Sequence, residues 1–227
     1  MECSVIKTVL ALALAAGMVA GPAHGASLSF SNPDSLTPIS QDGILELFDT
    51  NIGTLNTVRL TLSGTGSSRF VLNNTSGSGQ NVSASSVILM YFSSSLPSLN
   101  TTLDVLMPAL QLEASTGPIS LDAGAGAHLG PVVSSATLTL DTLMPSLFAQ
   151  AGGGNFTIYC ENSDEKRLDG GNGVVTLGLV TQAGCGATVE YDYTPRASQI
   201  PEPASTALIG LGMASLLATI HRRRQRR

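Results

Sequence analysis

Apolar and polar residues alternate along most of the middle of this chain, and this alternation is the feature that most constrains its fold. Every second residue from Thr57 to Leu62 is apolar, and a cluster of Ser, Gly and Thr that predicts a turn follows at 63–66. Side chains of a β-strand point alternately to its two faces, so a period of two predicts strands with one buried face. We expect further strands at 70–72, 87–92, 103–107, 110–112, 138–140, 156–160 and 189–193.

The composition agrees with strands joined by turns. The 227 residues include 27 Ser, 21 Thr and 24 Gly but no Trp, and only 12% are charged. We therefore predict an all-β domain of eight to ten short strands, with a β-sandwich or jelly-roll-like fold. Val87–Phe92 is apolar on both faces and is expected to be a central strand, and only Thr142–Gln150 suggests a short helix. No fixed repeat period is present, which argues against a solenoid or a propeller.

The N-terminal 25 residues have the features of a secretory signal peptide. Lys7 precedes an apolar run from Thr8 to Ala20, and small residues at 23 and 25 suit cleavage between Gly25 and Ala26. The Sec machinery and signal peptidase are the implied partners. A retained N-terminal anchor is the alternative, but no stop-transfer flank follows the apolar run.

The C-terminal end combines an apolar segment with a basic tail. Residues 204–220 carry no charge, and as a helix they would be about 25 Å long, enough to cross the hydrocarbon core. We expect a transmembrane helix there and a cytoplasmic tail at 221–227, by the positive-inside rule. A nucleic-acid patch is the alternative for this tail, but it adjoins a membrane span in an exported chain. The basic residues are Arg222, Arg223, Arg224, Arg226 and Arg227.

A short proline motif precedes the apolar segment, within a linker at 197–203. Pro201, Glu202 and Pro203, the apolar helix with its glycines and the terminal Arg cluster together resemble the PEP-CTERM sorting signal of Gram-negative, exopolysaccharide-producing bacteria. That resemblance implies processing by exosortase, a membrane enzyme that reads the motif, and delivery to the cell surface or a biofilm matrix. The two prolines keep the segment extended, as a processing enzyme requires. A plain C-terminal anchor is the alternative.

The remaining residues, 26–196, are expected to form one domain. Between the two ends lie five basic and fourteen acidic residues, so the net charge there is near −9. Such a surface repels nucleic acid and anionic polysaccharide. Three segments, 45–62, 70–75 and 187–195, resemble choice-of-anchor E domains. This resemblance covers most of 27–195 and implies no enzymatic activity.

Candidate catalytic groups are few. His128 is the only histidine in 26–196, and its Gly and Ala neighbours favour a surface loop over a general base. Glu190 and Asp192 lie two apart on a predicted strand, so they share a face, as a glycosidase pair requires. A solvated sheet face is the alternative, and it accounts for them better. No Gly-x-Ser-x-Gly motif is present, and we expect neither catalytic residues nor a cofactor.

Two further sites are possible in the second half of the domain. Cys160 and Cys185 are the only cysteines after signal cleavage, and in an oxidising compartment we expect them to form a disulfide, with two separate thiols as the alternative. Asp164, Glu165 and Asp169 lie in an acidic, glycine-ended segment that suggests a calcium loop. The spacing departs from that of an EF-hand, and a solvated hairpin loop is the alternative.

Together these features predict an exported, non-enzymatic protein of the cell surface or exopolysaccharide matrix that passes transiently through the inner membrane. The second hypothesis is a secreted carbohydrate-binding module, with tyrosines as sugar platforms, although the lack of Trp weakens it. The third is a secreted hydrolase that uses Glu190, Asp192 or His128. The tyrosines are Tyr91, Tyr159, Tyr191 and Tyr193.

Overall fold

The computed structural model describes residues 24–196, and within them the chain is almost entirely β-structure. The all-β prediction is confirmed. The strands are β1 (His24–Ser31), β2 (Ser35–Leu36), β3 (Ser40–Glu46), β4 (Phe48–Asp49), β5 (Gly53–Asn74), β6 (Gln80–Ser94), β7 (Leu110–Leu121), β8 (Gly126–Leu140), β9 (Ala149–Gln150), β10 (Asn155–Gly170) and β11 (Val175–Pro195). The helices are α2 (Pro97–Val105) and the 3-10 turns η1 (Pro145–Leu147) and η2 (Gly171–Gly173).

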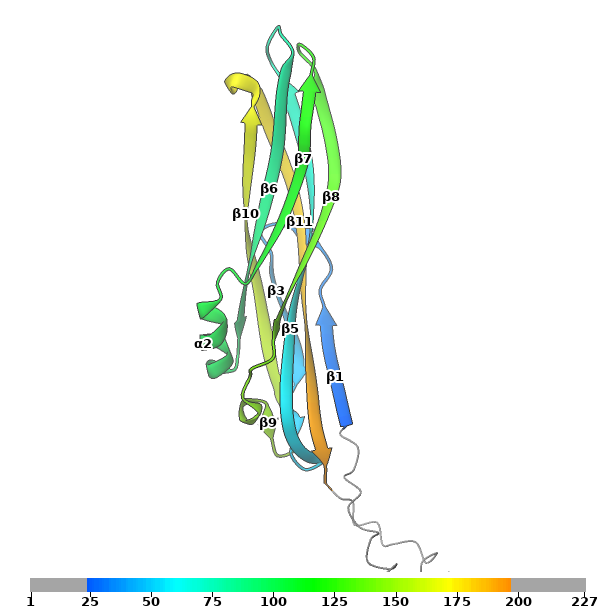
Figure 1. The fold of residues 1–227 in the computed structure, drawn as a ribbon, viewed down its shortest axis with the longest axis vertical. Helices are drawn as coiled ribbons and strands as arrows, with labels where there is room; N and C mark the ends of the chain where they lie inside the picture. The colour runs from blue at the N-terminus through cyan, green and yellow to red at the C-terminus, as the bar shows by residue number, and fades with distance from the viewer. Residues whose placement is uncertain (1–23, 197–227) are drawn as a thin grey trace, which may run out of the picture. The chain divides into compact units, whose positions relative to one another are not determined.

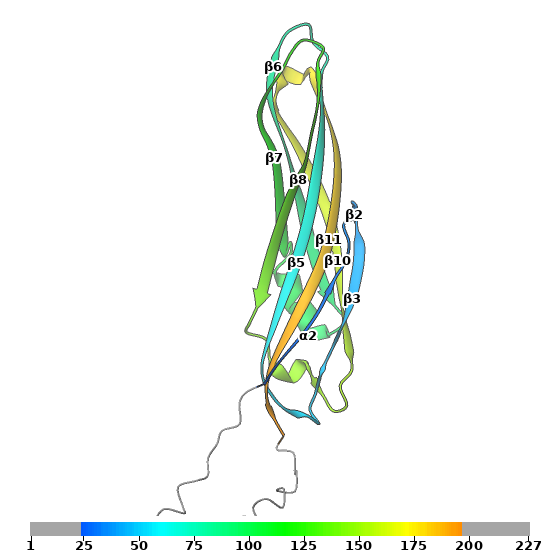
Figure 2. The ribbon, with the colours of Figure 1, turned by 90° about the vertical axis from the view of Figure 1, so that its right-hand side faces the viewer.

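Two antiparallel sheets form the body of the domain. Sheet A has the order β1-β11-β5-β8, with β2 also paired to β11, and sheet B has the order β3-β10-β6-β7. A small parallel pair joins β4 and β9. The domain is elongated (Figures 1 and 2), because its longest strand, β5, has 22 residues and spans about 70 Å. We call the end where β1 begins and β11 ends the base, and the opposite end, with η2, the tip.

The core lies between the sheets and follows the alternation in the sequence. Along β5, Val58, Leu60 and Leu62 are buried, while the residues between them face outward. They pack in one cluster with Ile88 and Met90 from sheet B. A second, smaller apolar cluster that includes Phe70, Leu72, Val82 and Val175 fills the tip half. Period-two patterning therefore fixes which face of each strand is buried.

The strands are longer than expected. The cluster at 63–66 was expected to be a turn, yet it continues β5 without interruption. A Cβ on Gly64 would lie 2.2 Å from the Met90 sulfur, and one on Gly66 would lie 2.8 Å from Ile88 Cδ1. These glycines therefore allow sheet B side chains to approach the β5 backbone closely, a known role of glycine within strands.

Three local predictions need correction. The expected strand at 103–107 is wrong, because Leu103 is buried on the inner side of α2, which begins at Pro97. The expected helix at 142–150 is only the single turn η1. Val87–Phe92 does lie centrally in its sheet, within β6, but only alternate residues are buried and the outer face is half-buried.

Several sequence predictions lie outside the described residues. These are residues 1–23 of the signal peptide predicted at 1–25, the PEP motif, the membrane segment at 204–220 and the basic tail. His24 and Gly25, the last two residues of the predicted signal peptide, begin β1. None of the helices between His24 and Arg196 has the length and hydropathy of a membrane span.

Candidate functional site

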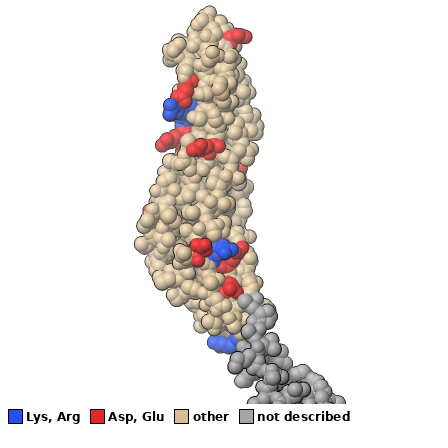
Figure 3. Space-filling view, in the orientation of Figure 1, with Lys and Arg blue, Asp and Glu red and all other residues tan. Residues whose placement is uncertain are grey.

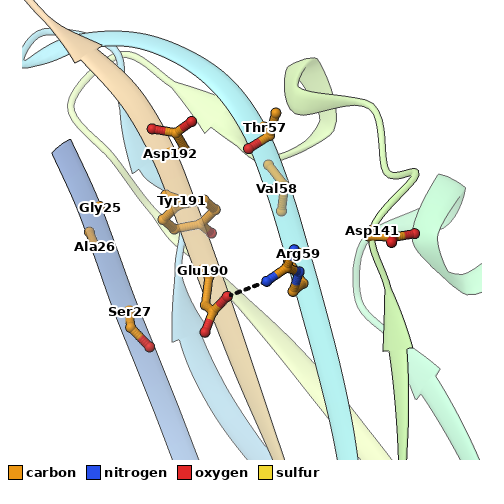
Figure 4. Close-up of a pocket in the computed structure, with 10 residues that line it drawn as sticks. All are labelled: Gly25, Ala26, Ser27, Thr57, Val58, Arg59, Asp141, Glu190, Tyr191 and Asp192. Atoms are coloured by element: carbon orange, nitrogen blue, oxygen red, sulfur yellow. Dashed lines mark hydrogen bonds and ion pairs between the residues drawn. The ribbon is translucent and has the colours of Figure 1, made fainter. Parts of the chain in front are cut away.

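A pocket at the base of sheet A contains Glu190 and Asp192, two of the charged residues that the sequence singled out (Figure 4). We call it the base pocket. Three adjacent strands line it, together with the residue that follows β8. Its residues are Gly25, Ala26 and Ser27 of β1, Thr57, Val58 and Arg59 of β5, Asp141, and Glu190, Tyr191 and Asp192 of β11.

Strand alternation places the polar groups of this pocket. Val58 is buried, so its neighbours Thr57 and Arg59 face outward, and Glu190 and Asp192 face outward on either side of buried Tyr191. The expectation that Glu190 and Asp192 share a face therefore agrees with the structure. Because β1 is antiparallel to β11, Gly25 lies opposite Asp192 and Ser27 opposite Glu190.

One ion pair crosses the pocket. Arg59 Nη1 lies 3.4 Å from Glu190 Oε2, and the two side chains remain 58% and 51% exposed. An ion pair this exposed stabilises the fold by less than about 1 kcal/mol. Asp141 and Asp192 add two further carboxylates, so three acids and one base line the pocket, which therefore favours cationic or hydroxyl-bearing groups over anions.

Charged residues are unevenly spread over the domain. In the face shown in Figure 3 they gather at two heights, with a largely uncharged band between them. Near the tip, Glu113 of β7 and Glu165, Lys166 and Arg167 of β10 line a second hollow, on sheet B. On this face, charged residues therefore lie mainly toward the two ends.

Tyr191 belongs to the wall of the base pocket but points into the core. Its hydroxyl donates a hydrogen bond of 2.7 Å to the Glu46 carbonyl of β3, and so connects the two sheets. Burial raises the pKa of the Tyr191 phenol well above its usual range. The Tyr191 phenol is therefore protonated at neutral pH and has a structural role, since its hydroxyl links β11 to β3.

His128 is far from the base pocket. It is exposed on β8 opposite Val71 of β5, twelve positions along that strand from Arg59. At about 3.3 Å per residue the two positions are about 40 Å apart. His128 therefore cannot act with Glu190 or Asp192 in one site.

The acidic segment near the tip is a strand, and the expected calcium or hairpin loop is not formed. Asp164, Glu165 and Asp169 all lie in β10. Successive strand residues face opposite ways, so Asp164 turns toward β11, where it accepts a hydrogen bond from Thr181, while Glu165 faces outward. Asp169 pairs with Arg167 instead, at 2.8 Å. Within residues 24–196 no three His, Cys, Asp or Glu side chains are grouped to hold a metal ion.

Cys160 and Cys185 are bonded to each other in the structure. Cys160 lies on β10 and Cys185 on β11, with their Cα atoms 6.6 Å apart. Both are buried, and the bond joins sheet B to sheet A through the core. It therefore fixes the relative position of the two layers midway along the domain.

The four tyrosines do not form one platform. Tyr91 and Tyr159 face outward on sheet B, where Tyr159 is 45% exposed. Tyr191 is buried in the core, and the ring of Tyr193 packs on Phe48 with centroids 5.0 Å apart. A sugar platform would therefore have to rest on Tyr91 and Tyr159 alone.

Sequence reasoning missed two members of the base pocket. Alternation in the sequence does predict that Arg59 faces outward, since Val58 and Leu60 face inward. Its ion pair with Glu190, 131 residues later, depends on β5 and β11 lying side by side, which no local pattern reveals. Asp141 lines the pocket because it follows the end of β8 at the base.

The C-terminal end of the chain was compared with known protein families. Residues 199–227 match the model of the PEP-CTERM protein-sorting motif. This chain carries a PEP-CTERM sorting motif. The prediction made from Pro201, Glu202, Pro203 and the Arg cluster is confirmed at that level. A PEP-CTERM motif supports an exported protein that an exosortase-type membrane enzyme processes.

Comparisons of the whole chain with curated proteins and with solved structures give no information about its function. No curated protein matches it. Among solved structures, the Tobacco streak virus coat protein is 13% identical with a TM-score of 0.21, over 79% of this chain and 92% of that one. A structure of infectious bursal disease virus, Gt strain, is 10% identical with a TM-score of 0.18, over 86% of this chain and 50% of that one. Nothing about function follows from scores this low.

Proposed function

We propose that this protein is a non-enzymatic component of the cell surface or exopolysaccharide matrix, delivered there by exosortase-type sorting. The observation that carries the proposal is the PEP-CTERM motif at 199–227, which begins four residues after β11 ends. The signal peptide at 1–25 and the membrane helix at 204–220 are parts of the same proposal. The signal peptide would direct export and be removed, and the membrane helix would then hold the β-domain on the outer side of the inner membrane until the motif is processed.

The surface of the β-domain supports a structural role in a polysaccharide environment. Thr61 and Thr65 of β5 and Thr137 and Thr139 of β8 face outward on sheet A, and Thr61 and Thr139 are within 3.2 Å of each other. Hydroxyls donate and accept hydrogen bonds without fixed charge, as sugar hydroxyls do. A hydroxyl-rich surface therefore suits contact with hydrated polysaccharide.

The same proposal covers partners and domain type. Sec machinery, signal peptidase and an exosortase-type enzyme would act on the chain in that order, and exopolysaccharide would surround the released domain. The similarity of 27–195 to choice-of-anchor E domains supports a surface protein without catalysis. The separation of His128 from Glu190 by about 40 Å also argues against a hydrolase site that combines these two residues.

Substitution of the motif tests the sorting step. The triple variant P201A/E202A/P203A is expected to accumulate unprocessed in the inner-membrane fraction, because the enzyme no longer recognises it. Immunoblots of membrane and matrix fractions measure this. The matched control, R196A/S198A, changes the last residue of the domain and one residue of the linker, and should be processed as the wild type is. Delivery of the triple variant to the matrix at the wild-type level would refute the proposal.

A further inference from the structure

Strand β11 has an uncovered edge in the tip half of sheet A. Residues 186–193 pair with β1, and residues 182–183 pair with β2. Among residues 24–196 no strand pairs with Val175–Val180 on that side. In Figure 2, β11 continues toward the tip beyond the end of β2. An unpaired strand edge exposes backbone N–H and C=O groups that can hydrogen-bond to a strand of another chain, and proteins usually protect such edges against this pairing.

The backbone groups at this edge can be assigned from the neighbouring pairings. The carbonyls of Cys185 and Thr181 accept hydrogen bonds from Asn32 and Thr37, both on the β1 and β2 side. In an antiparallel strand every second residue points its N–H and C=O to the same side. Val175, Leu177 and Leu179 therefore direct six backbone groups toward the open edge.

Other edges of the domain carry devices that discourage pairing. β8 contains Pro131 beside a register shift opposite Ser68 and Phe70, and β7 contains Pro118 beside a second shift. The tip half of β10 is also open, but it is heavily charged. Its charged residues are Asp164, Glu165, Lys166, Arg167 and Asp169. Proline, bulges and charges are the usual means of protecting an edge.

The β11 edge carries neither charge nor proline. Residues 175–181 read Val-Thr-Leu-Gly-Leu-Val-Thr. The side chains of Leu177 and Leu179 pack against the apolar cluster of the tip half but are only partly buried. A strand added here would satisfy the six backbone groups and also cover these two leucines.

We propose that Val175–Val180 pairs antiparallel with the same segment of a second copy of this chain. With Leu177 opposite Leu177, Val175 lies opposite Leu179 in both directions, and all six outward backbone groups of each copy are paired. This register is two-fold symmetric, as closed homodimers require. It also aligns apolar side chains with apolar side chains on the inner face, and small Thr176 with Gly178 on the outer face.

The surroundings of the edge are compatible with a second copy. The β10 residues from Asp164 to Asp169 include three acids and two bases, so the neighbouring edge carries a net charge of only −1 and contributes little repulsion. Sheet A would then continue from one copy into the other through the two β11 strands. Backbone pairing over one short edge predicts a dimer that forms as the concentration rises, as in a crowded matrix.

Amide hydrogen exchange measured on the full-length chain tests the pairing residue by residue. Even-numbered amides from Thr176 to Val180 point toward β5 and should be protected at every concentration. The amides of Val175, Leu177 and Leu179 should exchange quickly when dilute and about ten-fold more slowly when concentrated. Unchanged exchange of these three amides from micromolar to millimolar chain would overturn the proposal.

A charge substitution separates edge pairing from general association. Thr176→Lys introduces a cation at the open edge, close to its own symmetry copy, and should abolish the concentration-dependent protection. Thr137→Lys is the matched control, because Thr137 is also exposed on the outer face of an edge strand. That strand is β8, which Pro131 and a register shift protect against pairing. The control should keep the protection. Equal protection in both variants would mean that other surfaces cause association, which also contradicts the proposal. Neither result depends on exosortase sorting.

Discussion

Phe156→Ala is expected to lower the free energy of unfolding by about 4 kcal/mol, through the lost transfer free energy and the cavity that remains. Phe156 lies on the inner face of β10 and is 1% exposed. Its ring meets that of Phe148 edge to face, with centroids 5.5 Å apart. Such aromatic pairs add about 1 kcal/mol to area burial alone. Urea unfolding followed by circular dichroism measures the change.

Tyr159→Ala is the matched control for this prediction. Tyr159 is an aromatic residue of the same strand but faces outward, 45% exposed. We expect its removal to cost under about 1 kcal/mol, since much of its surface is already in water. Equal destabilisation by the two substitutions would show that the inner and outer faces of β10 are assigned incorrectly.

Removal of the disulfide is expected to have the next largest effect. In the C160A/C185A variant the free energy of unfolding should fall by about 3 kcal/mol, because the unfolded chain regains the freedom of a closed segment. The two cysteines are 25 residues apart. Alanine is chosen because both positions are buried and a serine hydroxyl there would lack water.

Reduction provides an internal check on the disulfide. The wild-type chain in excess dithiothreitol should unfold at the same urea concentration as the double variant does without reductant. If dithiothreitol and the double substitution both leave the unfolding midpoint unchanged, the two cysteines are not bonded in the folded protein.

The sequence predicted which face of each strand is buried better than it predicted strand lengths. Alternation from Thr57 to Leu62 identified the buried side of β5, because successive side chains of a strand point to opposite faces and the apolar ones are buried. Gly64 and Gly66 predict a turn, but glycine is common both in turns and where a side chain packs closely against a strand backbone. Only the position of Met90 and Ile88 on the opposite sheet distinguishes the two cases.

The helix α2 illustrates a second limit. Leu103 and Val105 fit a period of two, but Leu99 and Leu103 also fit a helical spacing of four, and both are buried in α2. Pro97 at the first turn of the helix is a start signal. Over such a short apolar segment the two periods are not distinguishable without knowing what packs against it.

Local sequence patterns likewise predicted only part of the base pocket. Glu190 and Asp192 share a face because they are two apart on one strand, which local reasoning predicts. Arg59 joins them from a strand 131 residues away, and His128 is excluded by the register of β8 on β5. Pairing of distant strands therefore decides which polar residues meet, and it is not encoded in any local pattern.

The central claim is that exosortase-type sorting delivers this protein, and the mass of the mature chain tests it most directly. Intact-mass spectrometry of the protein from cells with and without the exosortase, together with its subcellular fraction, is the measurement. The account predicts that the segment after the PEP motif is lost only when the enzyme is present, and that the processed chain then leaves the inner membrane. An intact C-terminus in both strains would contradict it.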